Sequence, residues 1–182
     1  MPAPQINLFT FFGLKTTISP FSVLAFLAMI PLTAWMSARW LFLALGPALL
    51  AGCLSSLLMF ASAWLHQWGH ARAARRAGYP MLGLHFFSLF SASQYPADEP
   101  ALPAAIHIRR ALGGFWVNGL IGLVFAPLAF YLWPRGGVLA WLTALGAVYN
   151  FFVLGLGALV PIDLPGVFTD DGGTLLRYWR ER

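Results

Sequence analysis

Four long apolar stretches, separated by short polar segments, dominate the pattern of this chain. They cover residues 18–36, 41–65, 111–133 and 138–160. A helix rises about 1.5 Å per residue, so each stretch is long enough to cross roughly 30 Å of hydrocarbon. The pattern therefore predicts an all-α membrane protein with about four transmembrane helices, and we expect residues 1–182 to form a single polytopic domain.

Two shorter segments have a different pattern. Residues 7–17 alternate between polar and apolar side chains at their start, and Gly13 interrupts them. Residues 81–90 are apolar and aromatic, but they lie in a connection, residues 78–107, that is too polar and proline-rich to span a bilayer. Such patterns favour short strands. We predict a small strand or hairpin element at the cytoplasmic face, or a re-entrant segment at residues 81–90.

Composition agrees with a bilayer environment and gives an orientation. Charged residues make up only 9% of the chain, against about a quarter in soluble proteins. The net charge of +5 comes from basic residues at the ends of the apolar stretches, which favours contact with lipid over binding of nucleic acid. Two basic residues lie on one side, Arg39 and Arg135, and nine on the other: Lys15, Arg72, Arg75, Arg76, Arg109, Arg110, Arg177, Arg180 and Arg182.

Basic residues concentrate in cytoplasmic loops. We therefore expect an integral, multi-pass protein with both termini in the cytoplasm, in a prokaryotic cell membrane.

Two histidines near the end of the second stretch have the spacing of metal ligands. His66 and His70 are four residues apart, so they share one face of a helix and can bind one metal ion together. A haem is not expected, because two ligands on one helical turn cannot reach opposite faces of the haem. In zinc proteases with this spacing the residue after the first histidine is a glutamate base. Here it is Gln67, whose amide cannot take up a proton near neutral pH.

A third ligand is needed, because catalytic zinc sites usually have three protein ligands. The chain has one cysteine, which lies in an apolar stretch, so a carboxylate is expected. Asp171 follows the fourth stretch, and Gly172 and Gly173 allow its backbone to approach the histidine helix. Asp170 is the alternative ligand. His85 and His107 lie in the polar connection, and we expect them at the surface.

Three separate segments resemble the site-2 protease family of intramembrane zinc metalloproteases. Residues 66–70 are similar to the family's His-Glu-x-x-His helix, residues 113–118 to its glycine-and-asparagine segment, and residues 150–173 to its last helix with an Asp-Gly motif. The resemblance covers roughly residues 60–178. Gln67 departs from it in place of the glutamate, Gly114 stands where proline is often expected, and the segment between Pro161 and Asp171 is longer.

The resemblance implies roles for particular residues. His66, His70 and Asp171 would bind Zn²⁺, and Asn118 and Asn150 would bind a substrate, which would be a membrane protein or transmembrane peptide. Gln67 would leave peptide hydrolysis weak or absent, either in a natural inactive relative or in a variant whose base was removed. The alternatives are a pseudoprotease that binds transmembrane helices and, ranked lowest, a small transporter or channel.

Overall fold

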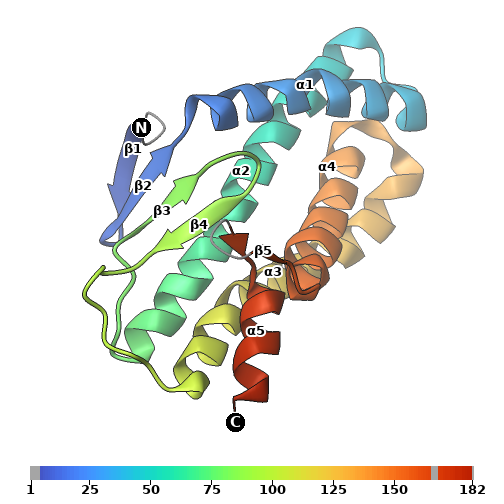
Figure 1. Cartoon of the computed structure of the whole chain (residues 1–182). Coiled ribbons are helices and arrows are strands. Elements are labelled where there is room, and N and C mark those ends of the chain that lie inside the picture. The colour runs from blue at the N-terminus through green and yellow to red at the C-terminus, as the bar shows by residue number, and fades with distance from the viewer. Residues whose placement is uncertain (1–4, 165–167, 182) are drawn as a thin grey trace.

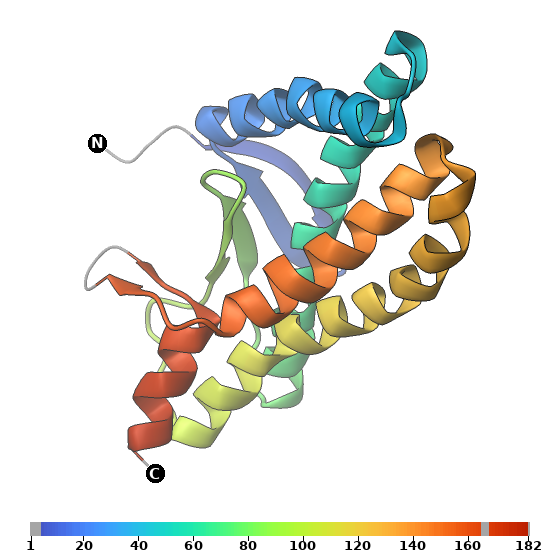
Figure 2. The same cartoon turned by 90° about the vertical axis from the view of Figure 1, so that its right-hand side faces the viewer.

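Four long helices form most of the computed structural model, which describes residues 5–164 and 168–181. They are α1 (Pro20–Leu41), α2 (Leu45–Arg76), α3 (Ala104–Leu132) and α4 (Gly137–Val148), which continues as η2 (Tyr149–Leu156) and η3 (Gly157–Leu159). Each of the four is long and apolar enough to cross a membrane, as predicted. In Figures 1 and 2, α3 and α4 run side by side. Helix α2 packs against both of them, against α1 and against the sheet.

The helices extend beyond the apolar stretches. The second stretch was expected to end at residue 65, but α2 continues to Arg76 and carries both histidines on its last turns. Similarly, α3 begins at Ala104, seven residues before the third stretch. Hydropathy marks the part of a helix that suits lipid, whereas backbone hydrogen bonds continue for as long as the helix is packed against neighbours.

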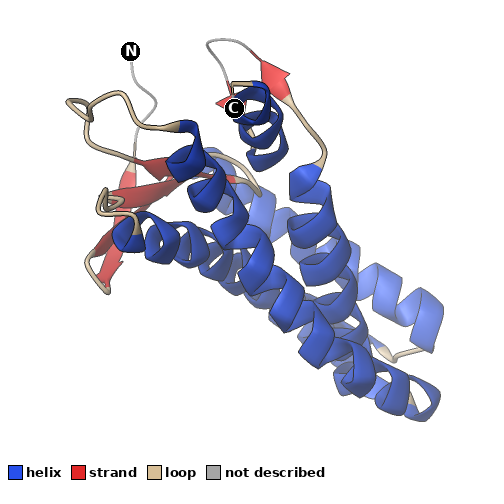
Figure 3. Cartoon of the chain, turned by 90° about the horizontal axis from the view of Figure 1, so that it is seen from below, coloured by secondary structure: helices blue, strands red, loops and turns tan. Residues whose placement is uncertain are grey.

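A four-stranded sheet packs beside α2. Its order is β1 (Ile6–Phe11), β2 (Leu14–Ile18), β3 (Gly83–Phe86) and β4 (Ser91–Gln94), with β1–β2 and β3–β4 antiparallel and β2–β3 parallel. The predicted strand and hairpin elements are therefore confirmed, although the hairpin extends to Gln94. Figure 3 shows the strands gathered at one end of the helices. The Trp64 indole donates to Thr16 at 3.1 Å and joins the sheet to α2.

Small residues bring the helices that carry the candidate site close together. Gly69 on α2 faces Gly113 on α3, and a Cβ atom on either glycine would collide with the backbone of the other. Gly52 on α2 approaches the backbone of α1 in the same way. Helices in membranes commonly pack through such residues, because lipid tails give apolar side chains no advantage in helix association.

The chain ends in a short helix, α5 (Asp171–Arg180), after the strands β5 (Asp163–Leu164) and β6 (Phe168–Thr169). Asp170 is the N-cap of α5, and its carboxylate accepts from the Gly173 backbone N–H at 2.7 Å. Gly172 lies against the backbone of η3, where a Cβ would not fit. This cap and this close contact place Asp171, the first residue of α5, beside the histidines of α2, and α5 packs against α3 near the start of that helix.

Candidate metal centre

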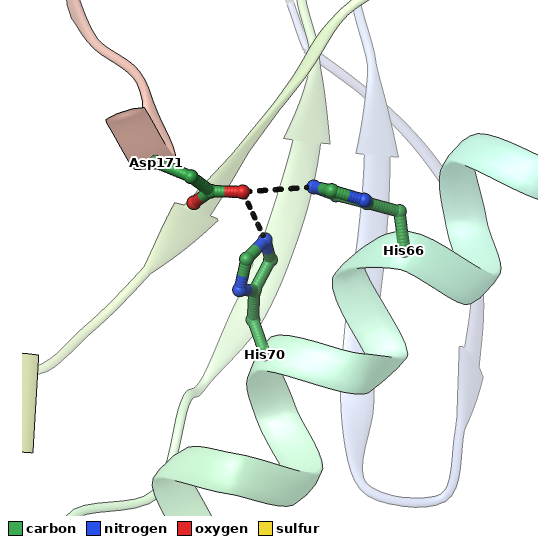
Figure 4. Close-up of side chains that lie close together, drawn as sticks. All are labelled: His66, His70 and Asp171. Carbon is green, nitrogen blue, oxygen red and sulfur yellow. Dashed lines mark hydrogen bonds and ion pairs between the residues drawn. The ribbon is translucent and has the colours of Figure 1, made fainter. Parts of the chain in front are cut away.

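Three predicted ligands meet between α2 and α5. His66 and His70 project from the same face of α2, and the Asp171 carboxylate reaches toward both rings from the start of α5 (Figure 4). One carboxylate oxygen, Oδ2, lies 3.2 Å from His66 Nε2 and 3.3 Å from His70 Nε2. Both histidines are buried, and Asp171 is largely buried. The structure therefore brings the three residues together as the sequence predicted.

The far side of each imidazole is fixed by a carbonyl oxygen. His66 Nδ1 lies 3.0 Å from Asn118 Oδ1, and His70 Nδ1 lies 2.7 Å from the Arg110 backbone oxygen. The Gly114 N–H also faces His70 Nδ1 as a competing donor, but at 3.3 Å it is farther from this nitrogen than the Arg110 oxygen is. Carbonyl oxygens only accept hydrogen bonds, so each Nδ1 carries the proton and each Nε2 presents a lone pair. Metal-bound histidines are commonly held in this way.

An amide relay sets the orientation of Asn118. Its Nδ2 donates to Asn150 Oδ1 at 2.7 Å and to the Ser62 backbone oxygen at 3.4 Å, which leaves its Oδ1 free to face His66. Asn150 Nδ2 in turn donates to Ser62 Oγ at 3.0 Å and to the Gly146 oxygen at 2.9 Å. Both asparagines are completely buried. The tautomer of His66 is therefore determined by residues on three helices.

The donor set fits a metal ion. Two Nε2 lone pairs and a carboxylate oxygen point at one another, so a cation, either a proton or a metal ion, must lie between them. Burial by itself raises the pKa of Asp171, but the facing imidazoles outweigh burial and hold this pKa well below its usual range. Tetrahedral zinc with bonds of about 2.0–2.2 Å places its donor atoms roughly 3.3–3.6 Å apart. The two Oδ2–Nε2 separations, 3.2 and 3.3 Å, are close to these values, and the ligand atoms of all three residues lie within 4.8 Å of one another.

Comparison with solved structures gives a match over almost the whole chain. The site-2 protease from Methanocaldococcus jannaschii matches with a TM-score of 0.65 at 20% sequence identity, over 98% of this chain and 72% of that protease. The fold is that of a site-2 protease. No family model and no curated protein matches the sequence. The structural match and the His66, His70 and Asp171 cluster together confirm the resemblance predicted from the sequence.

In this site-2 protease fold, the glutamate position of the zinc-protease motif is turned toward the sheet. Gln67 is only 4% exposed. Its Nε2 donates to the Ser91 backbone oxygen at 3.0 Å, and its Oε1 accepts from Ser93 Oγ at 2.7 Å. Both partners belong to β4. The side chain next to the metal ligands therefore has neither the chemistry nor the freedom of a general base.

Gly114 has a clear reason to lack a side chain. A Cβ at this position would collide with the imidazole rings of both His66 and His70. The residue was noted in the sequence as a departure from the proline expected there. In the site-2 protease fold of this chain, the departure makes room for the two ligands.

Arg110 joins the polar connection to the centre. Its guanidinium forms two hydrogen bonds with Glu99, at 2.9 and 2.6 Å, and lies 4.2 Å from the centre of the Tyr95 ring. The hydrogen bonds from Arg110, which outweigh burial, lower the pKa of Glu99. The backbone oxygen of Arg110 also accepts from His70. The Glu99 carboxylate is thus engaged with an arginine rather than free to act as a base at the centre.

The other histidines lie outside the cluster. His85 Nδ1 is 2.9 Å from Thr17 Oγ1 within the sheet, and the His107 ring stacks on Tyr178 of α5 at 3.9 Å. The sequence did not reveal the backbone oxygen of Arg110, which any residue would supply. The sequence indicated Asn118, the partner of His66, more clearly, because a buried asparagine in an apolar helix must form a hydrogen bond.

Proposed function

We propose that this chain is a zinc-binding, site-2-protease-like membrane protein with weak or absent hydrolytic activity. The observation that carries the proposal is the convergence of His66 Nε2, His70 Nε2 and Asp171 Oδ2, with both Nδ1 atoms held by carbonyl oxygens. Zinc held by these residues would supply Lewis-acid polarisation of a peptide carbonyl. The substrates would be peptide bonds of membrane-embedded segments, because both histidines lie on α2, a helix long enough to span a bilayer.

The chain's own residues limit hydrolysis. Asn118 and the Arg110 carbonyl orient the imidazoles, and Asp171 contributes a negative charge. Gln67, however, cannot remove a proton from water, and loss of general-base catalysis typically costs about 10²–10⁴-fold in rate. Binding of substrate by Asn118 and Asn150 remains a prediction, because their contacts here are with His66, Ser62, Gly146 and each other.

Orientation follows from the basic residues of the sequence. With nine of them on one side, both termini and the α2 end that carries the histidines are proposed to face the cytoplasm. A prokaryotic cell membrane remains the proposed location. Cleavage or binding of a substrate would then occur near the cytoplasmic boundary of the bilayer.

A second function is supported by Gln67. A pseudoprotease would use the same helices to bind transmembrane segments without cutting them and without needing the metal ligands, and an amide in place of the base fits that role. The two functions differ in what happens when a base is introduced. They also differ in whether the histidines are needed to retain a bound helix.

The experiment compares four forms of the zinc-loaded chain in liposomes with labelled single-span membrane peptides. We expect Gln67→Glu to cut a captured peptide at least about 10²-fold faster than the original chain. The matched control is the double variant with His66→Ala, which should not cut. No gain in cleavage from a captured peptide, with zinc bound, would contradict the protease reading. Equal capture by the original chain and by His66→Ala alone would favour the pseudoprotease.

A further inference from the structure

The side chain of Gln67 makes a two-point contact with the edge of the sheet. In the order β1–β2–β3–β4, β4 is an edge strand that pairs with β3. The Gln67 carboxamide donates to the Ser91 backbone oxygen and accepts from the Ser93 hydroxyl. It therefore bonds the edge strand at two residues, through the backbone of Ser91 and the side chain of Ser93.

The two partners require opposite chemistry from the side chain. The Ser91 carbonyl oxygen can only accept, so the atom facing it at 3.0 Å must carry a hydrogen. The Ser93 hydroxyl can donate, and at 2.7 Å it faces an acceptor. An ionised glutamate could keep the bond from Ser93, but its other oxygen would oppose the Ser91 carbonyl. A buried carbonyl without its donor is destabilising, and an adjacent negative oxygen adds repulsion.

The strand held by Gln67 leads to the metal centre. Tyr95 directly follows β4, and its ring lies 4.2 Å from the guanidinium of Arg110. The backbone oxygen of Arg110 accepts from His70. Gln67 follows His66 in sequence, so β4 is joined to α2 beside one ligand and, through Tyr95, to the residue that orients the other.

We propose that Gln67 is a positioning residue whose carboxamide fastens β4 to α2 beside the metal centre, at a position that accepts an amide and rejects a carboxylate. The proposal goes beyond the proposed function, because it rests on the contact between α2 and β4 and needs no metal. It also explains how a Gln67→Glu variant would gain a base. The Ser91 oxygen repels the carboxylate, which leaves β4, and the strand loses its attachment to α2.

The test is hydrogen exchange of the full-length, zinc-loaded chain in lipid nanodiscs, followed by mass spectrometry of the β3–β4 hairpin. We expect Gln67→Glu and Gln67→Met to speed exchange in residues 83–94 by about tenfold, while α4 exchanges as before. Glutamate, although it has the shape of glutamine, should protect no better than methionine. The matched control is Gln94→Glu, the same change on β4, which should leave exchange unchanged.

Coupling between the two side chains separates positioning from a general loss of stability. Ser93→Ala should speed exchange in the hairpin less than Gln67→Met, and adding it to Gln67→Met should have little further effect. Wild-type protection in Gln67→Glu, additive effects of the two substitutions, or equal acceleration in α4 would each overturn the proposal. Zinc content of the same samples tests the proposed function separately, because a missing metal leaves the comparison of β4 with α4 intact.

Discussion

Replacing Asn118 tests whether the amide relay holds His66 ready for a metal ion. In Asn118→Leu the side chain keeps a similar size but loses the oxygen that lies 3.0 Å from His66 Nδ1. The Nδ1 proton would then be buried without an acceptor, and the ring could turn or move its proton to Nε2, which then has no lone pair for a metal. Loss of such a partner commonly weakens metal binding by about 10–100-fold, or roughly 1.4–2.7 kcal/mol.

Asn118→Asp separates this effect from the role of Asn118 in packing. An aspartate keeps an oxygen for His66 but loses the nitrogen that donates to Asn150 at 2.7 Å. We therefore expect its zinc affinity to stay near that of the original chain, although the link between α3 and the fourth helix is weakened. Competition with a metal chelator on the purified protein measures the affinity of each form.

The control for this series is Ser37→Ala. Ser37 is also completely buried in a long helix, but its hydroxyl donates to Ala34 of the same helix at 2.8 Å, far from the centre in sequence. Its removal should leave zinc affinity unchanged. The reasoning would be refuted if Asn118→Leu bound zinc as tightly as the original chain, or if leucine and aspartate at position 118 weakened binding equally.

Two further substitutions test other parts of the site. Gly114→Ala should lower zinc content sharply while the helix signal in circular dichroism is kept, because its methyl group meets both imidazoles; normal zinc content would contradict the close approach. Glu99→Gln leaves the buried Arg110 without its negative partner. It should therefore lower the free energy of unfolding at neutral pH by about 1–3 kcal/mol. Because the pKa of Glu99 is lowered in the folded protein, its ion pair stabilises the fold fully at pH values above the ordinary carboxyl range. This stabilisation is lost as the pH falls through the lowered pKa. The stability gap between the two forms should therefore close in acid, and a constant gap would argue against the ion pair.

The sequence predicted the centre better than its surroundings. The spacing of His66 and His70 places them on one helical face by geometry alone, and the need for a third ligand pointed to the carboxylates beside Gly172 and Gly173. The match of the whole chain to a site-2 protease agrees with that prediction. The roles of Ser91 and of the Arg110 carbonyl could not be predicted, because both act through backbone oxygens that every residue has.

Long-range packing accounts for the remaining differences. The parallel pairing of β2 with β3 joins residues separated by the whole of α1 and α2, and no local pattern indicates such a pairing. The extension of α2 to Arg76 depends on contacts with α3, where Gly69 and Gly113 meet. Hydropathy predicted the number of spanning helices, because each must be apolar over the thickness of the bilayer. The residues at which the helices end are instead determined by packing against neighbouring helices.

The most direct test of the account is the zinc content of the purified chain, measured by elemental mass spectrometry. The account predicts about one zinc per chain, lost in Asp171→Asn and retained in Asp170→Asn. Asp170 is a suitable control because it adjoins the ligand and caps α5, and asparagine is an equally good N-cap. No zinc in the original chain, or zinc retained by Asp171→Asn, would contradict the metal centre.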